Sequence, residues 1–186
     1  MKKRLNICVS GAAEIKPCCK NIIEISKEVG REIARQDLVL LTGATTGVPY
    51  YSAVGCKEKN GTSIGFSPAS TEKEHIRSYK LPTDNFDLII YTGFNYAGRN
   101  LLLTRASDGI IIICGRTGTL NEFTVAFEDD KPIGVLEGTG GTADMIRGIL
   151  SQGYRGKGNV IFDEDPKNLV IRLVKLINKK RNNYKK

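Results

Sequence analysis

The sequence lacks most of the residues that mark metal-binding, disulfide-rich and membrane proteins. It has no tryptophan, a single histidine (His75) and five cysteines without a C-x-x-C pair. One histidine without further spaced ligands is poor evidence for a metal site. An odd cysteine count with Cys18 and Cys19 adjacent predicts reduced thiols. No apolar run approaches the ~20 residues of a membrane span, and no signal-peptide core follows the basic start. We expect a soluble, cytoplasmic protein with no metal, cofactor or membrane partner.

The net charge of +8 is partly concentrated at the C-terminus. Residues 179–186 are rich in lysine and arginine, and we expect them to form a frayed basic tail. No aromatic platform or recognised nucleic-acid motif accompanies this tail, so nucleic acid is not the expected partner. The remaining positive charge suits a small anionic ligand.

Short apolar runs alternate with longer amphipathic ones along the chain. The expected strands are 5–9, 38–41, 62–66, 88–91, 110–113, 133–136 and 160–162. The expected helices are 17–34, 50–58, 100–107, 119–128, 142–152 and 166–178. Alternating strands and helices pair in parallel through right-handed crossovers, and uniformly apolar strands belong in a sheet covered on both faces. The pattern predicts one α/β domain over 1–178: a Rossmann-like, doubly wound, mostly parallel sheet of about six or seven strands. The polar stretch 67–87 has the length of a functional lid or partner surface.

Loops rich in glycine and hydroxyl side chains follow four of the expected strands, at 10–13, 42–47, 115–119 and 138–142. Ligands of such sheets bind beyond the carboxyl ends of the strands, where these loops expose amides and helix N-termini that suit phosphate. The G-x-x-x-x-G-K-[ST] and G-x-G-x-x-G fingerprints are absent, which argues against a kinase, a P-loop hydrolase or a standard dehydrogenase. The expected ligand-binding residues are Ser10, Gly11, Gly43, Thr45, Thr46, Gly47, Arg99, Asn100, Gly115, Arg116, Thr117, Gly118 and Thr119.

The segment 98–122 resembles a known family. The residues that match its hallmark, P-G-G-x-G-T-x-x-E, are Gly115, Gly118, Thr119 and Glu122. Arg99 lies at the interval at which an arginine precedes this hallmark. The chain is thus similar, over about residues 5 to 152, to the lonely-guy family of cytokinin-activating phosphoribohydrolases, formerly called lysine decarboxylases. It also resembles the wider superfamily that includes the molybdenum cofactor carrier proteins.

Three residues depart from the family pattern. Cys114 replaces the proline of the hallmark, Arg116 replaces its second glycine, and Asn100 replaces the lysine that usually follows the arginine. Arg116 is expected to be strained if that position requires a positive φ. The pairing of arginine with asparagine is closer to the carrier-like branch. These departures weigh against hydrolysis more than against binding.

The resemblance implies an enzyme that hydrolyses the N-glycosidic bond of a nucleoside 5′-monophosphate to free base and ribose 5-phosphate. Arg99 and Glu122 are the expected catalytic residues: Arg99 holds phosphate or ribose, and Glu122 stabilises an oxocarbenium-like sugar. The alternative is a non-catalytic binder, carrier or sensor of a nucleotide or a molybdopterin-type cofactor. The family also implies a homo-oligomer, a dimer or larger.

Local structure offers competing explanations for some of these residues. Thr119 and Glu122 have the spacing of a capping box, which fixes a helix start. Arg99 is expected to open the helix 100–107, where a cation opposes the helix dipole, so ligand binding explains it better than local stability. Tyr50 or Tyr51 could stack on a base, although core packing is the more frequent role.

Overall fold

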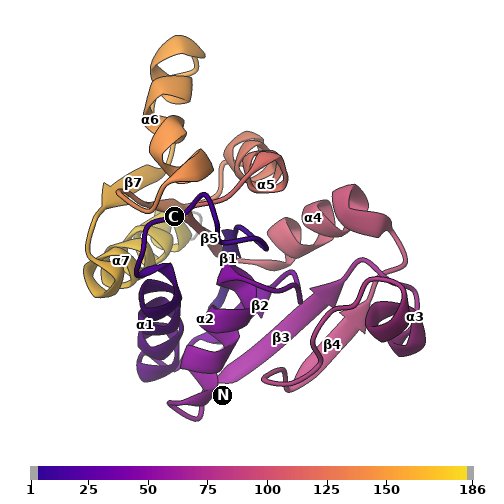
Figure 1. Cartoon of the computed structure of the whole chain (residues 1–186). Helices are drawn as coiled ribbons and strands as arrows, with labels where there is room; N and C mark the ends of the chain where they lie inside the picture. The colour runs from indigo at the N-terminus through magenta and orange to yellow at the C-terminus, as the bar shows by residue number, and fades with distance from the viewer. Residues whose placement is uncertain (1–3, 184–186) are drawn as a thin grey trace.

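A computed structural model describes residues 4–183 as a three-layer α/β protein (Figure 1). Its strands are β1 (Asn6–Gly11), β2 (Val39–Thr42), β3 (Thr62–Ser67), β4 (Leu88–Tyr91), β5 (Gly109–Ile113), β6 (Ile133–Leu136) and β7 (Val160–Asp163). Its helices are α1 (Ile22–Arg35), α2 (Val48–Lys57), α3 (Glu72–Arg77), α4 (Asn95–Ala106), α5 (Thr117–Glu128), α6 (Gly141–Gln152) and α7 (Pro166–Asn183). The predicted Rossmann-like fold is confirmed.

The strands of the described chain form one parallel sheet in the order β4-β3-β2-β1-β5-β6-β7. The chain starts at the centre with β1, moves outward to β4, and returns to β5 on the other side of β1. Cys8 of β1 pairs with Leu41 of β2 and with Ile110 of β5. The order therefore reverses between β1 and β5, and this is the point where ligands bind in open α/β sheets.

Two helical layers cover the sheet, as Figure 1 shows. Ile7 and Val9 of β1 belong to the core packed under α1, α2 and α7. Cys8 points to the other face and belongs to the core under α4, α5 and α6, with Leu103 and Phe123. Because both faces of the sheet are buried at its centre, β5 and β6 carry no polar side chain and do not alternate.

Several element boundaries differ from the predicted ones. Helix α1 begins at Ile22 instead of 17, because the Cys19 N–H donates to the Thr139 carbonyl, 3.1 Å away, and holds the preceding residues in a loop. Helix α4 begins at Asn95, well before the predicted residue 100. Helix α3 lies inside the stretch predicted to be a loop, and its N-cap Thr71 accepts a hydrogen bond from the Glu74 N–H.

His75 of α3 is fully buried and ties this segment to the sheet. Its Nε2 donates to the Pro82 carbonyl at 2.9 Å, and its Nδ1 lies 2.8 Å from Ser67 Oγ at the end of β3. Both ring nitrogens are therefore used within the protein. Residues 4–183 hold no group of three or more histidine, cysteine and acidic side chains that could bind a metal ion.

Helix α7 continues through Asn183, so the prediction of a frayed tail from 179 is wrong for its first five residues. Arg181 pairs with Asp108 at 2.6 Å, and Lys180 pairs with Asp130 at 2.5 Å. These contacts hold the last turns of the helix against the sheet. The remainder of the predicted tail, 184–186, lies outside the described residues. Within 4–183, no helix has both the length and the apolar content of a membrane span.

A disulfide joins Cys18 to Cys114, with the two Cα atoms 5.7 Å apart. The prediction of reduced thiols is wrong for these two residues and holds for Cys8, Cys19 and Cys56, which are free. Cys18 lies in the loop before α1, and Cys114 directly follows β5. The fold brings the two loops together at the carboxyl edge of the sheet across 96 residues of sequence, a proximity that cysteine spacing alone does not reveal.

Candidate functional site

A cavity of about 700 Å³ lies at the carboxyl ends of the strands. The loops after β1, β2 and β5, the first turns of α4 and α5, and the segment after α3 form its walls. The predicted binding and catalytic residues that line it are Gly11, Thr45, Thr46, Arg99, Asn100, Arg116, Thr117, Gly118, Thr119 and Glu122. Residues widely separated in the sequence thus meet at one site, at the edge where the parallel sheet predicts it.

Four predicted residues do not line the cavity and instead support residues that do. Ser10 is buried and donates a hydrogen bond to the Glu122 carboxylate. Gly43 leaves room for the Arg99 guanidinium, since a Cβ there would lie 1.8 Å from Nη1. Gly115 has a φ of +100°, which a side chain rarely adopts, and Gly47 packs against the loop after β1.

The start of α5 presents backbone amides to the cavity. The Leu120 N–H is the first to donate back along the helix, to the Arg116 carbonyl at 3.0 Å. The amides of 117–119 precede this bond and form the positive end of the helix. Gly118 borders open space, since a Cβ placed on it would have no atom within 4 Å. This helix start therefore has the geometry of an anion site.

Glu122 lies inside α5, and the predicted capping box is not formed. The N-cap of α5 is Arg116, with no side-chain capping hydrogen bond, so Thr119 is already within the helix. Glu122 is 7% exposed, and its carboxylate accepts from Ser10 Oγ. Burial raises the pKa of Glu122, an effect opposed by the charge of Arg99 and by the hydrogen bond from Ser10.

Arg99 lies in the second turn of α4, so the argument that places it at a helix start is wrong. It is 5% exposed. Its Nη1 donates to the Gly43 carbonyl and, at 3.2 Å, to the Phe66 carbonyl. Arg99 thereby links the ends of β2 and β3, and its buried Nε has no hydrogen-bond partner in the described chain. Burial lowers the pKa of Arg99, and the charge of Glu122 opposes this shift.

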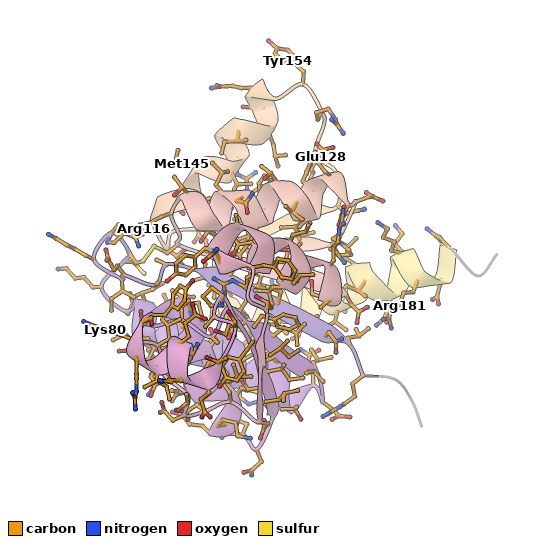
Figure 2. The ribbon with its side chains drawn as sticks, turned by 90° about the vertical axis from the view of Figure 1, so that its right-hand side faces the viewer. Lys80, Arg116, Glu128, Met145, Tyr154 and Arg181 are labelled. Carbon is orange, nitrogen blue, oxygen red and sulfur yellow. A yellow bond between two sulfur atoms is a disulfide. The ribbon has the colours of Figure 1, made fainter. Side chains whose placement is uncertain are left out.

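Arg116 stands at the rim of the cavity, paired with Glu14 at 2.9 Å. Both side chains are more than half exposed, so the pair itself contributes little stability. The φ of Arg116 is −129°, and the expected strain is absent. The positive φ values fall instead on Cys114 and Gly115. Figure 2 shows Arg116 and Lys80 at one edge of the molecule and Arg181 at the other.

The fourth predicted phosphate loop, 138–142, does not line the cavity. Its Thr139 Oγ1 accepts from the Cys114 N–H at 2.8 Å, and its Asp144 neighbour accepts from the amides of Gly138 and Gly140. Its polar groups are therefore used within the protein. The loop packs against the Cys18–Cys114 disulfide and does not contribute to the ligand site.

Ala12 and Ala13 of the predicted loop 10–13 also line the cavity. The lining residues that the sequence did not predict are Glu14, Tyr79, Lys80, Leu81 and Tyr96. The predicted base-stacking candidates Tyr50 and Tyr51 do not line it, and Tyr50 instead donates to Asp84 at 2.7 Å. Tyr96 lies one helical turn before Arg99, so a correct start for α4 would have placed it on the same face. Nothing in the local sequence points to Tyr79 or Lys80 beyond the length of their segment.

Comparison with known proteins agrees with this architecture. The chain is 32% identical over 135 residues to an uncharacterized protein of Archaeoglobus fulgidus, covering 73% of this chain and 82% of that protein. The molybdenum cofactor carrier protein of Chlamydomonas reinhardtii is 25% identical, with a TM-score of 0.75 over 95% of this chain and 99% of that one. The molybdenum cofactor binding protein of Rippkaea orientalis is 27% identical, with a TM-score of 0.73 and the same coverage. The model of the SLOG cluster4 family matches residues 4–170, and the chain belongs to this family, which confirms its resemblance to the lonely-guy superfamily.

Proposed function

We propose that the cavity binds a small phosphorylated ligand, with the phosphate at the start of α5. The carrying observation is that the amides of 117–119 open into a cavity of about 700 Å³ with Arg116 at its rim. Backbone amides at a helix N-terminus and a guanidinium are both well suited to bind phosphate. The likeness to proteins named as molybdenum cofactor carriers supports a nucleotide or a molybdopterin-type ligand.

A thermal-shift titration with AMP and GMP tests this binding. A ligand that binds only the native state raises the melting temperature, and the rise grows with the ratio of ligand concentration to Kd. Arg116→Ala is expected to weaken binding about tenfold, in line with a hydrogen bond to a charged group. Arg155→Ala is the matched control, because Arg155 is exposed and pairs with Glu128 instead of lining the cavity. The same affinity in both variants argues against a phosphate at the rim.

A second candidate function is hydrolysis of the N-glycosidic bond of a nucleoside 5′-monophosphate. The observation that favours it is the buried Glu122 carboxyl in the cavity wall, held by Ser10. Water oxygen bonds to C1′ while the C1′–N bond breaks. The electron pair of the broken bond goes to the base nitrogen, which takes up a proton, and the attacking water loses one. Ionised Glu122 stabilises the cationic sugar, and Arg99 opposes the effect of burial on the Glu122 pKa.

Chromatographic detection of free base separates the enzyme from the binder. The parent protein is expected to release base and ribose 5-phosphate, and Glu122→Gln is expected to abolish release while still binding. Glu137→Gln is the control, because Glu137 pairs with Arg147 and does not line the cavity. Binding without base release from any nucleoside monophosphate rejects hydrolysis and leaves the carrier or sensor.

We also propose a homodimer through the face that α4 shares with β4. Leu88 is 53% exposed, and Ile90 and Leu102 are also exposed. The register pairs Leu88 with Ile64 of the core under α4, so the two β4 side chains point to the α4 side of the sheet. Light scattering is expected to give a dimer for the parent and a monomer for Leu102→Asp. Met145→Asp, on exposed α6, should stay dimeric, and a monomeric parent contradicts the proposal.

A further inference from the structure

The cavity has two chemically different ends. One end consists of the amides and small side chains at the start of α5. At the other, Tyr79 and Tyr96 lie edge to face, with ring centroids 5.6 Å apart and an interplanar angle of 79°. Both tyrosines line the cavity, together with Lys80 and Leu81. The phosphate site described above uses none of these four residues.

Tyr96 is held in place while much of its surface remains open. The Arg99 guanidinium carbon lies 5.7 Å from its ring centroid, within cation–π range. Tyr79 contacts it from the segment after α3, and the Tyr79 hydroxyl donates to Asn95 Oδ1 at 2.7 Å. Tyr96 nevertheless remains 49% exposed. A fixed, half-exposed aromatic ring in a cavity wall is a surface on which another planar ring can stack.

The segment that carries Tyr79 and Lys80 is fixed to the body of the protein. The Tyr79 N–H donates to the Glu74 carbonyl, and the Leu81 N–H donates to the His75 carbonyl, both at 3.1 Å. The buried His75 ring in turn contacts Ser67 and the Pro82 carbonyl. These contacts account for a fully buried histidine that the chemistry at Glu122 does not use.

Lys80 adds a cation at the same end of the cavity. Its φ is +54°, and its side chain is exposed. Within 4–183, no carboxylate lies within ion-pair distance of its ammonium group. An ammonium group donates hydrogen bonds and accepts none. Beside an aromatic surface, it favours a heterocycle that presents oxygen or nitrogen acceptors.

We propose that Tyr79, Lys80 and Tyr96 form a second subsite, which binds the planar, oxygen-bearing heterocycle of the ligand. Guanine and pterin rings share this chemistry. The proposal deepens the phosphate-binding function and rests on it for the placement of one ligand across both ends. Tyr96 stacks on the ring, Tyr79 holds Tyr96 edge to face, and Lys80 donates to the acceptor edge of the heterocycle. These residues thus determine specificity, whereas the start of α5 binds the phosphate common to many ligands.

Calorimetric titration with four probes tests the subsite: GMP, ribose 5-phosphate, guanosine and neopterin. GMP is expected to bind the parent more tightly than ribose 5-phosphate, which lacks the ring. Tyr96→Ala and Tyr96→Leu are expected to weaken GMP about ten- to a hundredfold, the usual effect of losing one stacking partner. Ribose 5-phosphate binding should not change. Tyr96→Phe should retain GMP binding, as should Tyr154→Ala, which removes a 97% exposed tyrosine outside the cavity.

The possible outcomes separate the two proposals. Equal affinity of the parent for GMP and ribose 5-phosphate, unchanged by Tyr96→Ala, overturns the subsite and leaves the phosphate site intact. Binding of guanosine or neopterin that depends on Tyr96, without binding of ribose 5-phosphate, supports the subsite and contradicts the phosphate site. If the parent binds none of the four probes, both proposals fail. The stronger of guanosine and neopterin identifies the ring system.

Discussion

The two edges of the sheet use charged residues in opposite ways. At the amino edge, Asp108 accepts from the Asn6 N–H at 2.9 Å and from Arg181 at 2.6 Å. Lys131 there donates to the Ser107 carbonyl at 2.6 Å, and the hollow between these residues measures only about 220 Å³. At the carboxyl edge, Arg99 and Glu122 are more deeply buried but face a cavity of about 700 Å³. The difference indicates that one edge is closed for stability, and the other stays open for a ligand.

Replacing Arg99, at the carboxyl edge, is expected to cause the largest loss of stability. Arg99→Met removes the donor to the Gly43 and Phe66 carbonyls. At about 1.5–3 kcal/mol for each buried hydrogen bond to a charged group, the loss is about 3–6 kcal/mol. We expect the free energy of unfolding, measured by urea denaturation, to fall by about that amount. Arg105→Met is the control, since Arg105 is exposed and pairs with Asp129, and surface pairs contribute about 1 kcal/mol or less. Similar losses in the two variants contradict the special position of Arg99.

Reduction of the Cys18–Cys114 disulfide is expected to cause the second-largest loss of stability. The bond closes a loop of 96 residues, and loss of such a constraint typically costs about 2–4 kcal/mol. Dithiothreitol or Cys18→Ser is expected to lower the melting temperature. Nucleotide affinity should fall as well, because the loop before α1 supplies the Glu14 wall of the cavity. Cys19→Ser should change neither the melting temperature nor the affinity, since Cys19 is free. A parent whose melting temperature and affinity do not change on reduction would show that other contacts hold the loop.

Removing the Asp108 contacts at the amino edge is expected to lower stability by a smaller amount and to leave ligand affinity unchanged. Asp108→Ala removes the acceptor for Arg181 and for the Asn6 N–H. Hydrogen bonds to charged groups contribute about 1.5–3 kcal/mol when buried and less when exposed, so we expect a loss of about 1–2 kcal/mol. Affinity for GMP should stay at the parent value in calorimetry. A change in affinity here would remove the distinction between the two edges.

The smallest expected effect is a pH dependence that arises from Glu122. Because burial raises its pKa in the folded protein, the native state binds a proton at pH values where the unfolded chain, with a pKa of about 4.3, does not. Lowering the pH from neutral toward that value should therefore stabilise the parent relative to Glu122→Gln. The difference in unfolding free energy between the two proteins, followed against pH, measures this effect. A parent that loses stability relative to Glu122→Gln as the pH falls contradicts the raised pKa.

Local patterns predict the sheet and much of the cavity, whereas contacts distant in sequence escape them. Apolar runs and the hallmark around Gly118 and Glu122 suffice for the fold and for the amide end of the site. The start of α4 was missed because Asn95 has a positive φ and α4 has no side-chain cap. The hydrogen-bond acceptors of Arg99 are backbone carbonyls. Every residue has a carbonyl, so the sequence does not indicate which ones Arg99 contacts.

The aromatic end and the disulfide show the same limit. Tyr79 meets Tyr96 only because α3 folds back over the end of the sheet. Cys18 meets Cys114 only because β1 and β5 are neighbours in the sheet. Each contact follows from the topology, so it becomes predictable once the strand order is known.

Amide chemical shifts during a GMP titration test the central claim most directly. The account predicts saturable shifts of the Gly118 and Thr119 amides at the start of α5, while the amides of Asp108 and Arg181 at the other edge stay unchanged. Shifts confined to the Asp108 edge, or no shifts at all with GMP and ribose 5-phosphate at millimolar concentration, would contradict the assignment of the carboxyl edge as the phosphate site.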